Sequence, residues 1–109
     1  MPLFSKARPR VTSRGVFMPK EYRVKQKEML RQVKEQWGDR EPLEGPLRLT
    51  ILLEGEGRGD IDNIIGALFD TVNKVLWVDD RVNIISSVSV SWKKAPKAES
   101  CWRIVIHDA

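Results

Sequence analysis

The most constraining feature of this sequence is an apolar stripe that runs through its second half at the spacing of an α-helix. Apolar side chains step by four, three, four and three residues along this stretch, and they are Ile61, Ile65, Leu68, Val72 and Val75. This spacing places them on one face of a helix, and a helix with one apolar face buries that face against another element. The stripe therefore predicts a helix over residues 62–76 that covers an apolar surface.

The neighbouring segments supply the surface that this helix needs. Residues 47–54 are apolar on both faces, which predicts a strand in the interior of a sheet. Residues 82–94 alternate between apolar and polar, with Ile85 as the exception on the polar face, which predicts a strand with one buried face. Residues 101–108 predict a last strand. The side chains expected to point inward from these two strands are Val82, Ile84, Val88, Val90, Trp92, Trp102, Ile104 and Ile106.

A second helix is predicted before these strands. Pro19 suits the first position of a helix, because its missing N–H would have no partner there. Residues 20–37 then carry apolar side chains mostly at helical spacing, and Gly38 suits the end of the helix. The elements together predict an α+β fold. We expect one domain over residues 1–109 with a mainly antiparallel mixed sheet and two main helices, preceded by a basic arm or short strand at 1–18.

Residue counts exclude several classes of protein. The chain has one cysteine and one histidine, Cys101 and His107, so an internal disulfide is impossible and a tetrahedral zinc site within one chain is disfavoured. No apolar run approaches the roughly 18 residues of a membrane-spanning helix, and no apolar segment follows the basic N-terminus as in a secretory signal. We therefore expect a cytoplasmic protein without a membrane anchor. The sequence assigns no role to His107.

Charge is distributed unevenly along a chain whose net charge is only +4. Residues 1–34 hold ten Lys and Arg against two Glu, whereas residues 35–109 hold nine basic and thirteen acidic residues. This pattern suggests that one part binds a polyanion and another forms an acidic site, although a solvated basic arm would look the same. Trp37 and Trp77 are the candidates for contact with DNA or a partner, while Trp92 and Trp102 are expected in the core.

Two pairs of aspartates flank the helix predicted over 62–76. Asp60 and Asp62 bracket Ile61 where a glycine-rich loop becomes the helix, and Asp79 and Asp80 follow its end. If Ile61 turns inward, the first two carboxylates can point outward at a common point. Asp79 or Asp80 could reach the same point if the strand that follows them runs beside the strand predicted over 47–54. Alternatively, Asp62 is simply the helix N-cap, which would explain one aspartate well and the other poorly.

Three carboxylates at one point would require a cation. At about 4–5 Å they repel one another by several kcal/mol per pair, so they must protonate, separate or bind a metal ion. Hard oxygen ligands without His or Cys favour Mg²⁺ or Mn²⁺, and such an ion suits phosphodiester hydrolysis. The segment is not an EF-hand, because the sixth position from Asp60 is Ile65 in place of Gly and the twelfth is Thr71 in place of Glu.

The residues around these aspartates resemble a known family. The stretch "GDIDNIIGALFDTVNKVLWVDD" resembles the signature of RusA-type Holliday junction resolvases, with Asp-x-Asp-Asn opening a helix, then "FD", then "W-x-Asp-Asp". The N-terminal "KARPRVTSRGVFMPKEYR" also resembles the basic opening of that family, so the likeness extends from Lys6 to Trp92. The Asp-rich stretch is the specific part, because several unusual elements agree in spacing at once.

The resemblance implies a RusA-like endonuclease, a small homodimer that binds four-way DNA junctions and uses Mg²⁺ or Mn²⁺ to cut two opposed strands symmetrically. The family's catalytic, metal-binding aspartates fall on Asp60, Asp62 and Asp80, with Asp79 as a supporting neighbour and further candidate ligand. The implied location is the cytoplasm of a bacterial cell, with a phage or prophage origin also open. The residues expected to hold DNA phosphates are Lys6, Arg8, Arg10, Arg14, Lys20, Arg23, Lys27, Arg58 and Lys74.

One position departs from the family pattern. The family usually has a lysine four residues after the second aspartate, and this chain has Gly66 there. A lysine could hold the scissile phosphate, whereas glycine cannot and also costs about 1 kcal/mol of helix stability relative to alanine. Arg58 and Lys74 are candidates to replace it in space. Two alternatives therefore stay open: a branched-DNA-binding protein with weak or no cleavage, and a nuclease for other branched or flap DNA.

Overall fold

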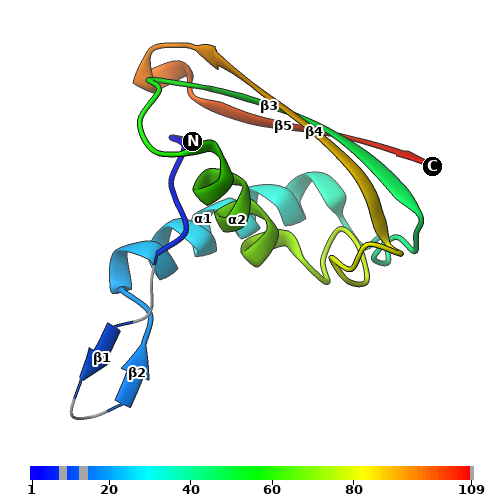
Figure 1. The fold of residues 1–109 in the computed structure, drawn as a ribbon, viewed down its shortest axis with the longest axis horizontal. Helices are drawn as coiled ribbons and strands as arrows, with labels where there is room; N and C mark the ends of the chain where they lie inside the picture. Colours follow the sequence, from blue (N-terminus) through cyan, green and yellow to red (C-terminus); the bar gives the residue numbers. More distant parts are fainter. Residues whose placement is uncertain (8–9, 13–14, 109) are drawn as a thin grey trace.

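The described part of the chain forms a three-stranded sheet with two helices against one of its faces (Figure 1). A computed structural model describes residues 1–7, 10–12 and 15–108. In chain order the elements are β1 (Arg10–Thr12), β2 (Gly15–Phe17), α1 (Lys20–Trp37), β3 (Leu47–Gly55), α2 (Ile61–Val72), β4 (Ile85–Lys94), the 3-10 turn η1 (Lys97–Glu99) and β5 (Cys101–Asp108). The antiparallel β1–β2 hairpin projects from the start of α1, away from the sheet. The expected α+β class, with two helices and a mixed sheet, is confirmed.

The strands of the sheet lie in the order β4-β3-β5. β3 is antiparallel to β5 and parallel to β4, with Leu47 opposite Ile85 at one end and Gly55 opposite Lys94 at the other. α2 is the crossover between the two parallel strands, so the loop after β3 and the loop before β4 lie at opposite ends of the sheet. At about 3.3 Å per residue, those two ends are roughly 26 Å apart along β3. This topology decides where the two pairs of aspartates lie.

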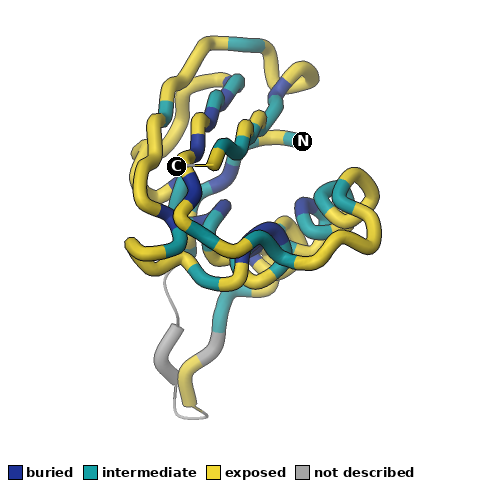
Figure 2. Tube along the Cα trace, turned by 90° about the vertical axis from the view of Figure 1, so that its right-hand side faces the viewer, coloured by how far each residue is buried: buried dark blue, intermediate teal, exposed yellow. Residues whose placement is uncertain are grey.

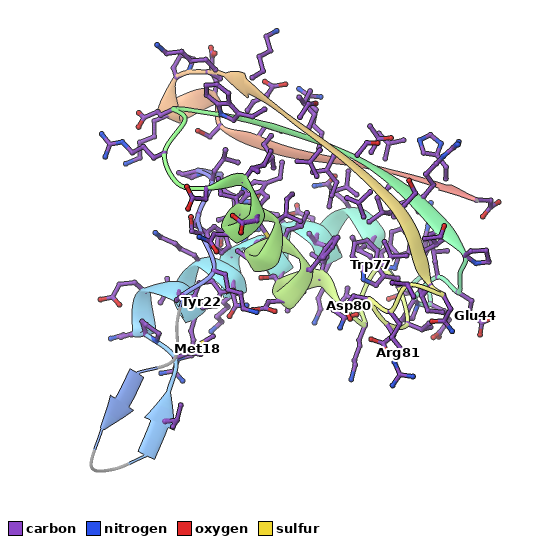
Figure 3. The ribbon with its side chains drawn as sticks, in the orientation of Figure 1. Met18, Tyr22, Glu44, Trp77, Asp80 and Arg81 are labelled. Carbon is purple, nitrogen blue, oxygen red and sulfur yellow. The ribbon has the colours of Figure 1, made fainter. Side chains whose placement is uncertain are left out.

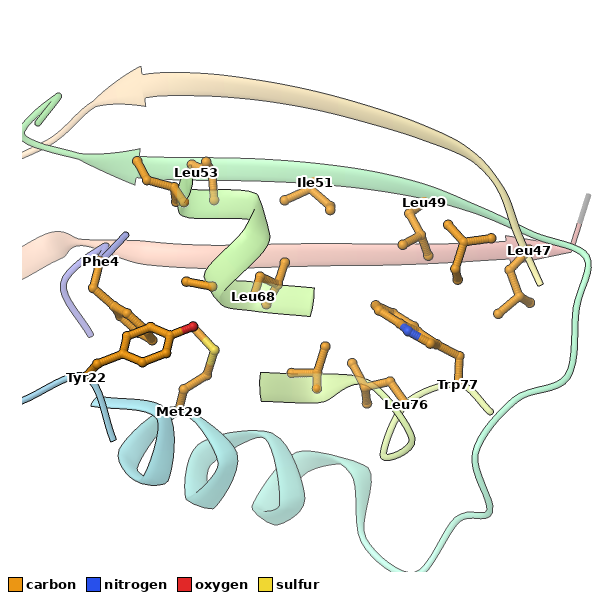
Figure 4. Close-up of a cluster of buried hydrophobic side chains, with 14 residues drawn as sticks. Phe4, Tyr22, Met29, Leu47, Leu49, Ile51, Leu53, Leu68, Leu76 and Trp77 are labelled. Carbon is orange, nitrogen blue, oxygen red and sulfur yellow. The ribbon is translucent and has the colours of Figure 1, made fainter. Parts of the chain in front are cut away.

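The core lies between β3 and the helices. Leu49, Ile51 and Leu53 are fully buried, because β3 is the central strand and these alternate side chains point toward the helices. Figure 4 shows this row of side chains and the residues that it faces, and Figure 2 shows where buried positions occur along the chain. The other core residues are Phe4, Tyr22, Met29, Leu47, Ile64, Ala67, Leu68, Val72, Leu76, Trp77 and Ile85.

The N-terminal segment is anchored in this core ahead of the basic residues that follow it. Phe4 is buried and makes edge-on ring contacts with Tyr22 and Trp102, at centroid distances of 6.0 Å and 5.3 Å. The amino group of Met1 donates a hydrogen bond to the carbonyl oxygen of Ser100 at 3.2 Å. Contacts at Met1 and Phe4 therefore fix the position of this segment.

Two expectations about α2 are wrong. The helix ends at Val72 instead of continuing to residue 76, because Lys74 adopts a positive φ of 68° and the chain turns back on itself. The turn is closed by the N–H of Leu76, which donates to the carbonyl oxygen of Val72 at 3.1 Å. Ile61 does not turn inward: it is 48% exposed at the open end of the helix, and Ile64 takes the buried position.

The strand after α2 also begins later than predicted. β4 starts at Ile85, because residues 81–85 form a turn. In this turn the carbonyl oxygen of Arg81 accepts hydrogen bonds from the N–H groups of Ile84 and Ile85, at 2.9 Å and 2.8 Å. Val82 precedes this strand and is 86% exposed, so its expected inward position is wrong. The register between β3 and β4 shifts next to Leu47, and Ile85, which the alternation placed among the polar residues, is buried.

The roles expected for two tryptophans are reversed. Trp77 is fully buried and makes an edge-on contact with Phe69 at 5.7 Å, because the tight turn after α2 directs it into the core. Trp92 is 44% exposed, because it lies near the end of the edge strand β4. Trp77 therefore contributes to stability, and Trp92 presents an exposed ring.

Trp77→Ala should lower the free energy of unfolding by about 3–5 kcal/mol, since it removes a fully buried ring from the core. The indole N–H of Trp77 is buried without an acceptor among the described residues. Trp77→Phe should therefore lower the free energy of unfolding much less than Trp77→Ala does. Urea denaturation followed by circular dichroism measures both changes. Trp92→Ala is the matched control, and an equal loss in that variant would contradict the assignment.

Candidate active site

A glycine-rich loop after β3 delivers Asp60 and Asp62 to the start of α2. Gly57 and Gly59 have positive φ values of 89° and 85°, a backbone conformation that other residues adopt at a cost. A Cβ on Gly57 would also lie 2.7 Å from the Trp92 ring, so glycine is required there for space as well. The loop turns tightly from the end of the sheet into the helix and leaves both aspartates exposed.

Neither aspartate is committed to capping the helix. The N-cap residue is Asp60, and its side chain makes no capping hydrogen bond. Asp62 lies in the first turn, where its Oδ1 accepts the N–H of Asn63 at 3.0 Å. The alternative that Asp62 is the N-cap is therefore wrong. Both carboxylates are exposed and available to a ligand.

Asp79 and Asp80 lie in the loop between Trp77 and β4. Asp79 accepts the N–H of Asp80 at 2.8 Å and forms an ion pair with Arg81 Nε at 2.9 Å. Asp80 is exposed, and its carboxylate has no hydrogen-bond or ion-pair partner in the described part of the chain. Figure 3 shows Asp80 and Arg81 in this loop, beyond the end of α2 that leads to Trp77. Asp79 thus holds the shape of the loop, and Asp80 is the carboxylate available to a ligand.

The two pairs of aspartates do not meet within one chain. Asp60 and Asp62 follow the carboxyl end of β3, whereas Asp79 and Asp80 precede the amino end of β4. Because these strands are parallel neighbours, the two pairs lie at opposite ends of the sheet. Accordingly, no group of three or more His, Cys, Asp or Glu side chains in residues 1–7, 10–12 and 15–108 could hold a metal ion. The expected three-carboxylate cluster is not formed by a single chain.

A further polar cluster, which the sequence did not single out, lies where α2 meets α1 and the N-terminal segment. Lys6 Nζ lies 3.4 Å from Asp70 Oδ1, and the Tyr22 hydroxyl donates to Asp70 Oδ2 at 3.2 Å. Asp70 therefore joins the N-terminal segment, α1 and α2. The signal that could have revealed this cluster is the spacing of Asp62, Gly66 and Asp70, which are four residues apart and so lie one above another on a helix.

Tyr22, the single tyrosine of the chain, should ionise at a pH well above that of a free tyrosine. Burial raises the pKa of its hydroxyl most, and the charge of Asp70 and the hydrogen bond to it raise the pKa further. The unfolded chain loses the proton of the Tyr22 hydroxyl at about pH 10, while the folded chain keeps it. The stability that Tyr22 contributes is therefore complete below that pH and is lost as the pH rises through the folded-state pKa.

Ultraviolet absorbance of tyrosinate measures this pKa directly, because no other tyrosine contributes to the signal. In Asp70→Asn the pKa of Tyr22 should fall toward its ordinary value, because the neighbouring negative charge is gone. An unchanged pKa in this variant would show that Asp70 has no part in the shift.

The expected DNA-binding residues of the N-terminal third that the structure describes lie in three segments: Lys6 before β1, Arg10 in β1, and three residues on α1. Arg8 and Arg14 lie outside the described residues, and Arg10 is described only by its backbone position in β1. Three further candidates are exposed on the side of α1 that faces away from its buried residues: Lys20, Arg23 and Lys27. Neither α1 nor any other helix in the described ranges is long and apolar enough to cross a membrane.

Arg58 and Lys74, the two candidates to replace a side chain at Gly66, lie beyond opposite ends of α2. Arg58 lies in the glycine-rich loop, almost fully exposed and 3.8 Å from Glu56, and Lys74 follows the far end of α2. A Cβ added to Gly66 would instead meet the side chain of Lys6, at 3.3 Å from Cδ and 3.6 Å from Cβ. The cation nearest to this position therefore comes from the N-terminal segment.

An apolar pocket of about 270 Å³ opens beside Asp60, between the glycine-rich loop and β4. Its lining residues are Leu53, Gly57, Arg58, Gly59, Ile61, Ile64 and Trp92. An exposed aromatic ring next to a guanidinium group suits a nucleobase, because bases stack on aromatic side chains and arginine adds positive charge. The sequence did not predict this pocket, because Ile61 and Trp92 were expected in the core.

One comparison assigns the chain to a family. The family model for endodeoxyribonuclease RusA matches residues 1–106, which include the N-terminal segment, both pairs of aspartates and nearly all of the sheet. No curated protein and no solved structure matches the chain. The match covers almost the full length, and it agrees with the motifs around Asp60, Asp62 and Asp80. The chain therefore belongs to the RusA endodeoxyribonuclease family.

Proposed function

We propose that this protein is a divalent-metal-dependent endonuclease that resolves four-way DNA junctions by paired, symmetric cuts. Its family supplies the general class, a DNA endonuclease. The observation that carries the proposal is the Asp60 and Asp62 pair, which is exposed and uncommitted to capping. The pair follows the carboxyl end of β3, the position at which sheets with crossover helices usually bind ligands. We place the enzyme in the cytoplasm of a bacterial cell, where its DNA substrate lies.

The catalytic site would form between two copies of the chain. Asp80 lies at the opposite end of β3 from Asp60 and Asp62, so one chain does not supply the three carboxylates together. A two-fold dimer repeats each contact, so the Asp80 loop of one copy can meet the glycine-rich loop of the other at two equivalent places. Two equivalent sites would then face two equivalent strands of a symmetric junction.

The donor set suits Mg²⁺ or Mn²⁺ in such an assembly. Asp60, Asp62 and Asp80 offer hard carboxylate oxygens, the ligands that these ions prefer. A bound ion would supply a Lewis acid for the scissile phosphate and a water of lowered pKa. The carboxylates hold and orient the ion, while Asp79, paired with Arg81, steadies the Asp80 loop.

Basic residues of the N-terminal third would bind the arms of the junction. The exposed face of α1 carries Lys20, Arg23 and Lys27, and the β1–β2 hairpin, with Arg10 in its first strand, extends beyond the start of that helix. Lys and Arg contacts to phosphates release bound counterions, so the affinity for DNA should fall as salt is raised. Arg8 and Arg14 belong to the same segment of sequence and are proposed to act with them.

A branched-DNA-binding protein that does not cut is the second candidate, and Gly66 is the observation that favours it. The position lacks the side chain that would hold the scissile phosphate. If no other group fills that role, the protein would bind a junction tightly and leave it intact. A nuclease for flaps would share the same acidic pair and differ only in the DNA that it prefers.

Cleavage of an end-labelled four-way junction by the purified protein separates these candidates. With Mg²⁺ we expect nicks at symmetric positions in two opposed strands, and with EDTA we expect none. Flap and linear duplex DNA serve as competitors, and a gel shift in EDTA reports binding. Salt-sensitive binding without nicks would contradict the nuclease. A preference for the flap would contradict the junction as substrate.

A further inference from the structure

We propose that Lys6 is the lysine that binds the scissile phosphate, and that it takes the place left open by Gly66. The proposal rests on the proposed nuclease function and names a residue for it. A lysine from the N-terminal segment would then complete a site whose aspartates come from the start of α2. Three sets of contacts support this assignment: those of its backbone, of its side-chain stem and of its ammonium group.

The backbone of Lys6 is fixed beside the first turn of α2. Its N–H donates to the carbonyl oxygen of Asn63 at 2.8 Å, one residue after Asp62. Phe4, two residues earlier, is buried in the core. Ser5 lies so close to the glycine-rich loop that a Cβ on Gly59 would be 2.6 Å from its hydroxyl oxygen. The segment therefore holds Lys6 next to the aspartate pair.

The stem of the Lys6 side chain crosses α2 at Gly66. A Cβ on Gly66 would lie 3.3 Å from Lys6 Cδ and 3.6 Å from Lys6 Cβ, so the stem lies where a side chain at residue 66 would begin. The glycine thus has a physical reason in this chain: it provides room for a lysine that arrives from another segment. A long side chain at residue 66 and the observed path of Lys6 would compete for the same space.

The ammonium group lies on the face of the helix that also bears Asp62. Lys6 Nζ is 3.4 Å from Asp70 Oδ1, and both side chains are partly exposed. Asp62 and Asp70 lie one turn before and one turn after Gly66, each about 5.4 Å along the helix from it. Rotation of the flexible stem about Gly66 would move the ammonium from Asp70 toward Asp62. Exposed ion pairs are weak, so Asp70 positions the ammonium in the absence of DNA without retaining it when a phosphate arrives.

Substitution of Lys6 tests the proposal in the full-length protein. Lys6→Ala should slow single-turnover cleavage of a four-way junction by about 100-fold, the effect of removing one group that stabilises the transition state. Junction affinity, measured by gel shift in EDTA, should change far less than the rate. Lys93→Ala, at an exposed lysine of β4 on the sheet, is the matched control and should cut like the unmodified protein. Thermal unfolding verifies that each variant is folded.

Relocation of the lysine tests whether the two positions are equivalent. The double variant Lys6→Ala with Gly66→Lys should recover most of the lost rate, because its new lysine starts from the helix face that Lys6 now crosses. Asp70→Asn tests whether Lys6 acts in cleavage or only in folding. This variant removes the ion pair between Lys6 and Asp70 but keeps the Lys6 ammonium group. We expect Asp70→Asn to lose much less rate than Lys6→Ala. Lys6→Gln, which keeps most of the stem, replaces Lys6→Ala if that variant does not fold.

Four outcomes would overturn the proposal. Cleavage by Lys6→Ala at the rate of the unmodified protein would exclude Lys6 from the reaction. Equal losses in Asp70→Asn and Lys6→Ala, or no recovery in the double variant, would show that Lys6 acts through its contacts within the protein. Absence of cleavage by the unmodified protein on junction, flap and duplex DNA alike would overturn the nuclease function, and this assignment with it. If the unmodified protein and Lys6→Ala both cleave at the same rate, the role of Lys6 is excluded and the nuclease function stands.

Discussion

Asp62→Asn should reduce Mg²⁺-dependent cleavage of a four-way junction by on the order of 1,000-fold or more, as expected when a residue essential to the reaction is removed. The carboxylate of Asp62 is exposed in the first turn of α2 and does not cap the helix, so its replacement leaves the fold intact. Junction binding should be retained or strengthened, because the variant removes one negative charge from a surface that meets phosphates. Single-turnover cleavage and a gel shift on the same preparation measure both quantities.

The matched control for this prediction is Asp39→Asn, which removes the same charge from an exposed acid in the connector between α1 and β3. That variant should cut at the rate of the unmodified protein. Full activity in Asp62→Asn would exclude the acidic pair at the start of α2 as the site. A parallel loss of binding and cleavage in Asp62→Asn would indicate damage to the fold instead of to the reaction.

A mixture of two inactive variants, Asp62→Asn and Asp80→Asn, should recover cleavage. The two residues lie at opposite ends of the sheet in one chain, so each site would draw Asp62 from one copy and Asp80 from the other. A mixed dimer then has one site with both residues replaced and one site with both intact. Its product should be a junction with a single nick in place of paired nicks, and a native gel separates this nicked junction from the duplexes that paired nicks release.

A second mixture provides the control for this experiment. Asp60→Asn and Asp62→Asn alter the same end of the chain, so every site in their mixed dimers contains one replaced residue. This mixture should remain inactive under conditions in which the first recovers. Equal recovery in both mixtures, or recovery in neither, would contradict a site shared between two copies.

Local patterns predicted several elements because their cause is local. α1 ends before Gly38 as predicted, and Pro19, predicted as its first residue, is its N-cap one position earlier. The backbone properties of proline and glycine act at their own positions, so these residues mark the ends of the helix to within one residue. The central strand β3 was predicted over 47–54 from its apolar content and extends one residue further, to Gly55. The family was indicated by motif spacing and is confirmed by a match over residues 1–106.

Other features depend on contacts between distant segments, and local patterns misjudged them. Five residues at helical spacing suggested that Ile61 and Val75 belong to one stripe, but α2 is only twelve residues long and its ends are set by the loops that join it to the sheet. Trp77 was a candidate for contact with DNA and is fully buried, because the turn at Lys74 directs the chain into the core. An alternating pattern indicates which side chains share a face of a strand. It does not indicate whether another layer of the protein covers that face, and Trp92 on β4 is 44% exposed.

The sequence by itself determined the chemistry of this protein: its acidic pairs, its basic N-terminal third and its membership of a nuclease family. These follow from residue types and their spacing, which are properties of the chain alone. Only the tertiary structure decided how these residues are combined. The parallel pairing of β3 with β4 separates Asp80 from Asp60 and Asp62, and the packing of Phe4 brings Lys6 over Gly66. Both results come from contacts between segments far apart in sequence, and no local pattern encodes which segments will meet.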